Sequence, residues 1–378
     1  MFKINKNPLS FGLMLASKAL AQRQQEQIIY RSVRIKTVVE KKKAYVYFES
    51  NSGHNAIRTC LYEIQDYKKD VDVLVDCMKL MEIVTKATVT EISFELIDEE
   101  NILVTANGEN KLRFLPGKMT PEFPVFKETD LAGMMKTKRF VDICKYAVPF
   151  STDDVHKQLT MGLCIDQNRL HATDEVKQLT ISNIGLKLSE QLTFNSVAKD
   201  MVSLFSDDLD LNFYFGAVDG AQTKTHLVLT VDNYQMYIIK YQTEYASDIL
   251  REVNEKCEKF KNFITIAKTS TLEVLSRILV FQDANDILSL TSIENGLILE
   301  VTNFDTGETG KEVVDAALEI SDEFYEQKIL VSLSNFKILL ETLPFESFKL
   351  SFEDTGSFLA FVDGDYTAWL TIKKYNAE

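Results

Sequence analysis

The chain has 378 residues, of which 45% are hydrophobic and 26% are charged, and this composition excludes a largely disordered protein. No apolar run reaches the roughly eighteen residues of a membrane-spanning helix, and the N-terminus lacks the pattern of a signal peptide, so we expect a cytoplasmic protein without a membrane contact. Because the net charge is −14, the distribution of the basic residues is more informative than their number.

Helical and strand-like patterns recur three times along the chain. Each repeat begins with a predicted first helix, which starts near Pro8, Leu131 and Ser270. Strands are predicted next, at residues 27–39, 44–48, 161–165, 179–182, 287–291 and 297–301. A second helix follows a residue that can cap its first turn, at Asp72, Asn195 and Ser334. Three strands close each repeat, at 90–96, 102–106 and 111–115, at 209–215, 226–231 and 236–241, and at 348–353, 358–362 and 368–373.

The spacing of the repeat predicts the domain organisation. Successive cap residues are 123 and 139 positions apart, which is the size of one small domain. We therefore expect three similar domains, at residues 1–126, 127–253 and 254–378. Each is predicted to be of the α+β class, with two helices packed on antiparallel sheet.

The sequence holds no recognised catalytic or metal-binding motif. The four histidines lie far apart, and the five cysteines have no CxxC spacing, so we predict buried thiols and no metal site. Phosphate-binding loops and nucleophile elbows are also lacking. We therefore expect neither an enzyme nor a cofactor. The alternative is an enzyme with an unrecognised carboxylate site, which would require two or more of four residues to converge in a cleft: Asp153, Asp154, Asp174 and Glu175.

Basic residues occur on all six predicted helices, although the chain as a whole is acidic. Any one of them reads as an ordinary solvent-facing residue, but their recurrence in equivalent helices indicates a shared surface. If the helices face a common interior, that surface would suit a phosphate backbone. The residues predicted to face nucleic acid are Lys18, Arg23, Lys79, Lys86, Lys136, Lys138, Arg139, Lys145, Lys199, Arg277 and Lys337.

Three stretches resemble motifs of one known family. Residues 107–126 (NGENKLRFLPGKMTPEFPVF) are similar to the strand, turn and E-[FY]-P sequence that ends the family's first domain. In the second predicted domain, FVDICKYAVPFSTDDVHKQLTMGLCID and LHATDEVKQLTISN are similar to an S-x-D-x-x-x-x-L-x-G segment and an A-T-D-G-H-R-L motif. Residues 244–253 stand in the place of a second E-[FY]-P sequence. The family is the sliding clamp of bacterial replicases, the β subunit of DNA polymerase III.

The resemblance implies a processivity factor. Two three-domain protomers would join head to tail into a homodimeric ring around double-stranded DNA, with the basic helices on the inside and no contact to specific bases. The DNA polymerase and the clamp loader would dock through short peptides in a pocket between the second and third domains. Carried over residue by residue, the resemblance places that pocket at Leu159, Thr160, Thr173, Val176, Lys177, Leu179, Arg251, Val253, Trp369, Leu370 and Ile372.

Departures from the family pattern affect the predicted pocket. Glu175, Val176 and Lys177 replace the usual Gly-His-Arg, and Ala246 stands where Pro is expected, so the resemblance predicts an altered peptide preference. Two positions also have purely structural interpretations. Thr173 and Asp174 are typical of a turn between strands, and Trp369 is typical of a core aromatic.

A second hypothesis is a non-enzymatic scaffold of three domains that binds other proteins without encircling DNA. Convergence of the basic side chains on one face would distinguish the clamp from the scaffold. The predicted strands at 111–115 and 297–301 are candidate edges through which two copies could pair.

Overall fold

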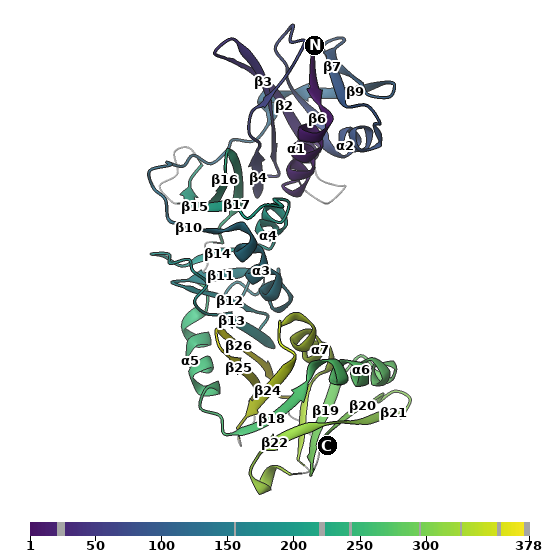
Figure 1. Cartoon of the computed structure of the whole chain (residues 1–378), viewed down its shortest axis with the longest axis vertical. Coiled ribbons are helices and arrows are strands. Elements are labelled where there is room, and N and C mark those ends of the chain that lie inside the picture. Colours follow the sequence, from purple (N-terminus) through teal and green to yellow (C-terminus); the bar gives the residue numbers. More distant parts are fainter. Residues whose placement is uncertain are drawn as a thin grey trace. The chain divides into compact units, whose positions relative to one another are not determined.

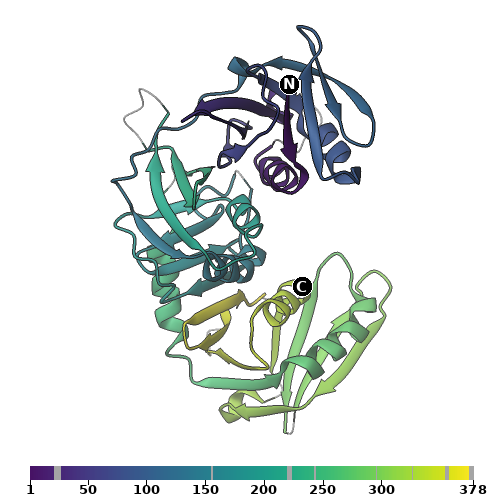
Figure 2. The ribbon, with the colours of Figure 1, turned by 45° about the horizontal axis from the view of Figure 1, so that its top comes forward.

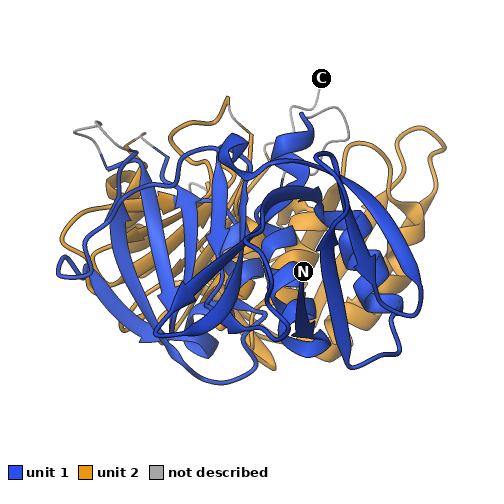
Figure 3. Ribbon diagram, turned by 90° about the horizontal axis from the view of Figure 1, so that it is seen from above, with its two compact units in different colours: residues 1–141, 194–242 blue, residues 142–193, 243–378 orange. Residues whose placement is uncertain are grey.

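The computed structural model describes residues 1–20, 27–154, 156–218, 224–241, 244–294, 296–325, 327–353 and 357–373. The chain forms two compact units, which Figure 3 shows in different colours. The first unit comprises residues 1–141 and 194–242, and the second comprises residues 142–193 and 243–378. Within the described ranges, no helix is long and apolar enough to cross a membrane.

The first unit is built on one antiparallel sheet (Figure 1). Its strands run in the order β1-β7-β8-β9-β6-β2-β3-β4-β17-β16-β15-β10, and β5 pairs with β3. Their bounds are β1 (Phe2–Asn5), β2 (Ser32–Glu40), β3 (Lys43–Asn51), β4 (Asn55–Arg58), β5 (Tyr62–Glu63), β6 (Asp72–Asp76), β7 (Glu91–Leu96), β8 (Asn101–Thr105), β9 (Glu109–Pro116), β10 (Gly133–Lys136), β15 (Asp210–Gly216), β16 (His226–Val231) and β17 (Tyr234–Ile239).

Helices cover one face of this sheet. They are α1 (Lys6–Lys18), α2 (Cys77–Lys86), α4 (Val197–Val202) and the first part of α3 (Thr137–Ala147), with short 3-10 turns η1 (Ile28–Arg31) and η2 (Gly117–Met119). α1 contacts both α2 and α4. Leu9, Leu13 and Ala16 form its buried stripe, at the spacing of a helix face. Gly12 lies against Phe48 of β3, and a Cβ atom there would be 2.9 Å from the phenyl ring.

The second unit contains two antiparallel sheets, in the orders β14-β11-β12-β13-β26-β25-β24-β18-β22 and β21-β20-β19-β23 (Figure 2). The strands of the first are β11 (Leu163–Asp166), β12 (Arg169–Thr173), β13 (Lys177–Ile181), β14 (Leu192–Phe194), β18 (Asn262–Ala267), β22 (Ala316–Glu319), β24 (Ser347–Phe352), β25 (Phe358–Asp363) and β26 (Tyr366–Thr371). Those of the second are β19 (Ile287–Ile293), β20 (Gly296–Thr302), β21 (Thr309–Val314) and β23 (Lys328–Ser332).

The helices of the second unit pack on both of its sheets, with α6 mainly on β20 and β21 of the smaller one. They are α5 (Ser247–Cys257), α6 (Lys268–Ile278) and α7 (Leu333–Thr342), with 3-10 turns η3 (Val148–Phe150), η4 (Leu279–Phe281) and η5 (Asp322–Phe324). α6 contacts α7, and α7 contacts β26, whereas α5 contacts β25. In Figure 1, α5 lies on the opposite side of β25 and β26 from α7. It has no counterpart in the other two repeats among the described elements.

The predicted α+β fold and the order of elements are confirmed. Each repeat contains a strand, a first helix, four strands, a second helix and three strands. The repeats run from β1 to β9, from β10 to β17 and from β18 to β26, and β5, β22 and α5 are additional elements. The three predicted domains at 1–126, 127–253 and 254–378 stay a prediction. The predicted boundary between residues 253 and 254 falls inside α5.

Two of the three predicted helix caps are wrong. Asp72 begins strand β6, and the side chain of Asp76 caps α2 by accepting from Lys79 N at 3.0 Å. Ser334 lies inside α7, which Ser332 caps through Asn335 N at 3.1 Å. Asn195 does accept from Val197 N, at 3.1 Å, where α4 begins. The error at Asp72 has a physical cause, because β6 is a run of buried apolar residues whose periodicity cannot be told from a helix.

The predicted start of the third helix is also wrong. Residues near Leu131 lead into strand β10, and α3 begins at Thr137. Lys136 therefore lies on a strand rather than on a helix. Its partner in the register is Asp210 of β15, and the Lys136 Nζ atom is 2.7 Å from that carboxylate.

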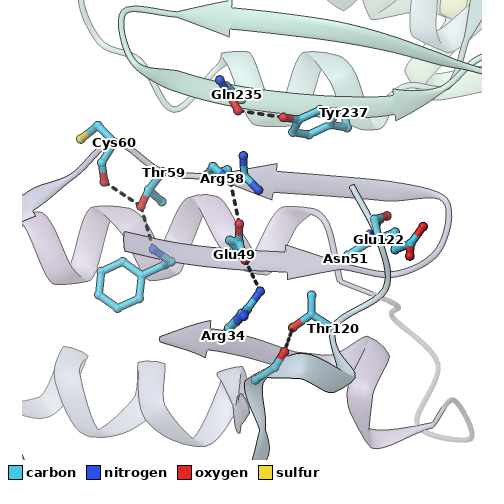
Figure 4. Close-up of polar contacts among 12 residues, drawn as sticks. Arg34, Glu49, Asn51, Arg58, Thr59, Cys60, Thr120, Glu122, Gln235 and Tyr237 are labelled. Atoms are coloured by element: carbon cyan, nitrogen blue, oxygen red, sulfur yellow. Dashed lines mark hydrogen bonds and ion pairs between the residues drawn. The ribbon is translucent and has the colours of Figure 1, made fainter. Parts of the chain in front are cut away.

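One strand junction in the first unit joins the first repeat to the second. β4 pairs with β17, and Arg58 lies opposite Gln235. Figure 4 shows the polar contacts there: the buried carboxylate of Glu49 accepts from Arg34 and Arg58, and the Tyr237 hydroxyl donates to Gln235 at 2.7 Å. Phe123 and Phe126 pack beside it against the cluster of Ala56, Tyr214, Val228 and Tyr237.

A junction of the same kind occurs in the second unit. β13 pairs with β26, and Lys177 lies opposite Leu370 while Gln178 lies opposite Trp369. β4 and β13 occupy the same place in their repeats, and so do β17 and β26. The two junctions therefore use equivalent strands.

Candidate functional sites

A tight turn joins β12 to β13 in the second unit. The hydroxyl of Thr173 donates to the carbonyl of Lys177 at 2.7 Å, and Asp174 Oδ1 accepts from the backbone N–H groups of Val176 and Lys177. Glu175 has a φ of 78°, the left-handed region that favours glycine. The hydrogen bonds of Thr173 and Asp174 agree with their interpretation as turn residues.

Three chain segments meet at this turn. Lys157 Nζ donates to the Asp174 carbonyl at 2.8 Å and lies 3.7 Å from the Glu175 carboxylate. Thr160 Oγ1 donates to Glu175 Oε1 at 3.3 Å. The carbonyl of Leu159 accepts from Ala246 N at 3.0 Å, which holds the segment against the start of α5.

The structure thus brings part of the predicted pocket together. Arg251, one turn into α5, lies within 3.1 Å of Asp166 and 3.0 Å of Asp248. Lys177 is buried, and its ammonium bonds to Asp174. The backbone of Val176 accepts from Thr371 N at 2.9 Å, just before Ile372. These contacts place both charged residues of the prediction in ion pairs.

Other predicted pocket residues lie in the core. Leu179 and Leu370 are fully buried, and because alternate strand residues point to opposite faces, Trp369 lies on the other face from Leu370. Trp369 packs with Leu250 and Cys257 of α5, and Val253 is packed against the same cluster. The Trp369 ring also contacts Phe358 at 4.7 Å between centroids. This agrees with the interpretation of Trp369 as a core aromatic.

An exposed apolar patch remains beside the turn. Leu159 is 58% exposed and Val176 is 40% exposed. Ile249, which is 62% exposed, lies in the first turn of α5, three residues beyond Ala246. Ile249 is not among the predicted pocket residues, because residues 244–253 were interpreted as the second E-[FY]-P sequence of the family. The periodicity of Leu250, Val253, Asn254 and Cys257 was the available signal for a helix.

A buried polar cluster lies between α5 and the sheet. Thr180 Oγ1 accepts from Asn254 Nδ2 at 3.0 Å and from the Gln178 amide, and it is 2.8 Å from His171 Nδ1. Within the described residues, His171 Nε2, Gln178 Oε1, Asn254 Oδ1 and Trp369 Nε1 have no partner. Burial lowers the pKa of His171 to about 4. The imidazole is therefore neutral at neutral pH.

The predicted basic residues differ in whether an acid neutralises them. Arg23 lies outside the described residues. Five side chains have carboxylate partners within 3.7 Å: Lys86 with Glu82, Lys136 with Asp210, Lys199 with Asp200, Arg277 with Glu312 and Lys337 with Glu341. No ion pair is found within the described chain for Lys18, Lys79, Lys138, Arg139 and Lys145.

The helices nevertheless carry positive charge. The six helices in repeated positions, α1, α2, α3, α4, α6 and α7, contain eleven Lys or Arg residues and five Asp or Glu residues. The whole chain has 42 of the former and 56 of the latter. Positive charge is therefore concentrated on the helices of an acidic protein.

Two strand edges are available for pairing. β21 pairs with β20, and within the described residues its other edge has no partner. β9 pairs with β8 through residues 109–113 and with β6 through residues 114–116 only, and a cavity of about 840 Å³ borders Leu74, Leu112 and Phe114 there. The predicted edge at 297–301 is wrong, because β20 lies between β19 and β21.

Comparison with solved structures identifies the fold. The DNA polymerase sliding clamp of Pseudomonas aeruginosa is 15% identical and superposes with a TM-score of 0.81 over 99% of each chain. A putative DNA polymerase III β subunit from Eubacterium rectale is 14% identical, with a TM-score of 0.82 over 100% of this chain and 99% of that one. The β subunit of Thermotoga maritima is also 14% identical, with a TM-score of 0.81 over 99% of both.

The chain has the fold of a bacterial sliding clamp. No protein-family model matches the sequence, and no curated protein matches it by sequence. The clamp fold accounts for the repeated strand orders and for the two equivalent junctions. In the described part of this clamp fold, no group of three or more His, Cys, Asp or Glu residues is placed to hold a metal ion.

Proposed function

We propose that the protein is a DNA sliding clamp, a processivity factor that encircles duplex DNA and tethers a polymerase. The observation that carries the proposal is the set of strand edges. β4 pairs with β17, and β13 pairs with β26. β21 is the strand equivalent to β4 and β13 in the third repeat, and among the described residues it has no corresponding partner. The strand of the first repeat that is equivalent to β17 and β26 is β9.

The third junction therefore requires another copy of the chain. β21 of one protomer would pair with β9 of the second protomer. β21 of the second would pair with β9 of the first, and the assembly would be closed. Side chains near both edges support this pairing. Val280 and Val313 are 75% and 55% exposed beside β21, and the cavity beside β9 offers the apolar surface of Leu112 and Phe114.

The charge of the helices supports DNA as the enclosed ligand. A duplex is bound without sequence readout when cations oppose its phosphates. Lys18, Lys79, Lys138, Arg139 and Lys145 would provide these cations, because no carboxylate neutralises them within the described residues. The five ion-paired cations would contribute less, since their partners also bring negative charge towards DNA.

The exposed patch of Leu159, Val176 and Ile249 is proposed as the docking site for the peptide segments of a polymerase and a clamp loader. These three side chains give apolar contacts next to a rigid hydrogen-bonded turn. Arg251 and Lys157 are nearby cations that already have carboxylate partners. The patch would therefore select apolar anchor residues more strongly than acidic ones.

The test combines light scattering with retention on DNA. A closed clamp is expected as a dimer of the 43.1 kDa chain that stays on nicked circular plasmid at moderate salt and leaves the same plasmid after linearisation. The ionic contribution is checked by substituting Lys138 and Arg139 together with Ser, which should lower retention without changing the dimer mass. Equal retention on circular and linear plasmid would contradict encirclement.

A three-domain protein scaffold is the alternative supported by the five neutralised cations. It predicts a chain that does not discriminate between circular and linear DNA. It also predicts a partner complex whose stability does not depend on DNA. A monomer without DNA retention would favour the scaffold over the clamp.

A further inference from the structure

The tip of the β2–β3 hairpin has an unusual backbone. Lys41 and Lys42 form the two-residue turn, with φ of 46° and 69°, and Glu40 pairs with Lys43 across it. A two-residue turn with both φ positive is typical of Asn-Gly and similar sequences, and lysine rarely adopts it. The local sequence therefore conflicts with the turn it forms. Residues in such strained backbone conformations are found most often at functional sites.

One face of the same hairpin carries two tyrosines and a third lysine. Lys36 lies opposite Tyr47, and Val38 lies opposite Tyr45, so all four side chains share a face. The other face holds Phe48, which is buried against Gly12 of α1. The tyrosine face is therefore the side of the hairpin that α1 does not cover. Tyr45 and Tyr47 are both partly exposed there.

Three of the four lysines of the hairpin have no ion-pair partner among the described residues. Lys43 is paired with Glu63 at 3.0 Å, but within the described residues no carboxylate lies within ion-pair distance of Lys36, Lys41 or Lys42. Lys41 and Lys42 are exposed at the tip. Lys36, Lys41 and Lys42 add positive charge beside the two tyrosines, on a face that also holds the carboxylates of Glu40, Glu63 and Asp72.

We propose that Lys36, Lys41, Lys42, Tyr45 and Tyr47, here called the hairpin platform, bind single-stranded nucleic acid. Exposed aromatic rings on a sheet face stack on unpaired bases, and neighbouring lysines contact phosphates. The Cα atoms of Tyr45 and Tyr47 are separated by two strand residues, or about 7 Å, which allows each ring to stack on a different base. Duplex DNA offers no open base face to these rings, so a single strand is the better match.

This site is distinct from the proposed enclosure of duplex DNA. The platform lies on the side of the first unit's sheet that faces away from α1, whereas the duplex is proposed to face the helices. It needs neither a second copy nor a closed ring. A protein that failed the circular-plasmid test could therefore still bind a single strand, and the two proposals can fail separately.

The first experiment measures fluorescence anisotropy of short labelled oligo(dT) and oligo(U) with the full-length protein, over a series of salt concentrations. Replacing Lys41 with Asn and Lys42 with Gly removes both charges and also supplies the preferred turn sequence. We expect the salt slope of log K to decrease by about 1.4, because each single-strand phosphate contact contributes about 0.7. The thermal midpoint should be unchanged or higher, because the turn is relieved.

A second variant tests stacking. Replacing Tyr45 and Tyr47 with Thr keeps residues that favour strands and is expected to weaken binding roughly thirtyfold or more, since each of the two stacked bases contributes roughly fivefold or more. Lys256→Asn with Lys259→Asn is the control, because it removes the same charge from exposed positions in the second unit. It should leave the affinity unchanged. Comparison of oligo(dT) with oligo(U) shows whether the strand is DNA or RNA.

Four results would overturn the proposal. The first is absence of binding by the unmodified protein at low salt. The second is equal weakening by the control and by the lysine-tip variant, which would indicate a general charge effect. The third is preference for a duplex of the same length over the single strand. Loss of binding together with a lowered thermal midpoint in the lysine-tip variant would also contradict it, since that variant should fold at least as well.

Discussion

Glu49 and Arg58 form an ion pair at the first strand junction, with Arg58 Nε 2.6 Å from Glu49 Oε1. The Glu49 side chain is 1% exposed, and its second oxygen accepts from Arg34 at 3.1 Å. Arg34 in turn bonds to Asp72, and this carboxylate raises the pKa of the guanidinium. A buried acid between two arginines therefore links β2, β3 and β4 beside the junction of β4 with β17 (Figure 4).

Replacing Glu49 with Gln should destabilise the first unit. The substitution removes two charge-assisted hydrogen bonds at a buried site while Arg34 keeps its bond to Asp72, and the expected loss of free energy of unfolding is roughly 2 kcal/mol. Denaturant unfolding measures this change. Glu63→Gln is the matched control, because it breaks an exposed pair with Lys43 and should have little effect. Equal effects of the two substitutions would show that burial of Glu49 is unimportant.

The stability of the second unit should depend on pH through His171. Burial lowers its pKa to about 4 from an ordinary value of 6.5, so between these pH values the unfolded chain binds a proton that the folded chain does not. The free energy of unfolding should therefore fall as pH drops from 6.5 towards 4, by roughly 3 kcal/mol in total.

His171→Gln provides the comparison, because glutamine does not titrate. The difference in free energy of unfolding between the two proteins should change over that pH window and be constant above it. His226, whose pKa is also lowered by burial, is present in both proteins and cancels. A difference that is independent of pH would contradict the neutral, buried state of His171.

Glu175 tests the cost of its backbone conformation. At a φ of 78°, glycine should be more stable than alanine by about 1 kcal/mol, because alanine retains the Cβ atom that is unfavourable there. Both substitutions remove the contacts to Lys157 and Thr160 equally. The difference between Glu175→Gly and Glu175→Ala in thermal unfolding therefore isolates the backbone. A more stable alanine variant would refute this explanation.

Val280→Glu should weaken the proposed dimer. A carboxylate introduced at a 75% exposed position would be buried without a partner when β21 meets β9 of another copy. We expect sedimentation or light scattering to show a shift from dimer to monomer at micromolar concentration. Ile249→Glu, an equally drastic change on α5, should leave the mass unchanged. A dimer that persists in the Val280 variant would place the interface elsewhere.

The same two variants exchange roles in a peptide-binding assay. Ile249→Glu should lower the affinity for polymerase-derived peptides by tenfold or so, because loss of an apolar anchor costs about 1.4 kcal/mol or more. Val280→Glu should bind the peptides normally. Titration calorimetry with the isolated peptides separates these outcomes, and normal binding by the Ile249 variant would exclude the exposed patch as the docking site.

The sequence by itself determined the α+β class, the threefold order of elements and the resemblance to sliding clamps. Strands such as β16 and β25 were recognisable because each is a short apolar run bounded by turns, and both features depend only on neighbouring residues. The start of α4 at Asn195 was recognised for the same reason, since the Asn195 side chain bonds to a backbone N–H only two residues along the chain.

Tertiary structure decided which apolar residues belong to a surface and which to the core. Trp369, Leu370 and Ile249 are all large apolar residues. Trp369 is buried against α5 and Leu370 is buried on the other face of the sheet, whereas Ile249 is exposed. The strand edges were decided in the same way, because an edge is defined by the absence of a neighbour and not by its own residues. Burial and strand pairing depend on segments far apart in the chain, and local periodicity does not indicate which distant segment packs against a given residue.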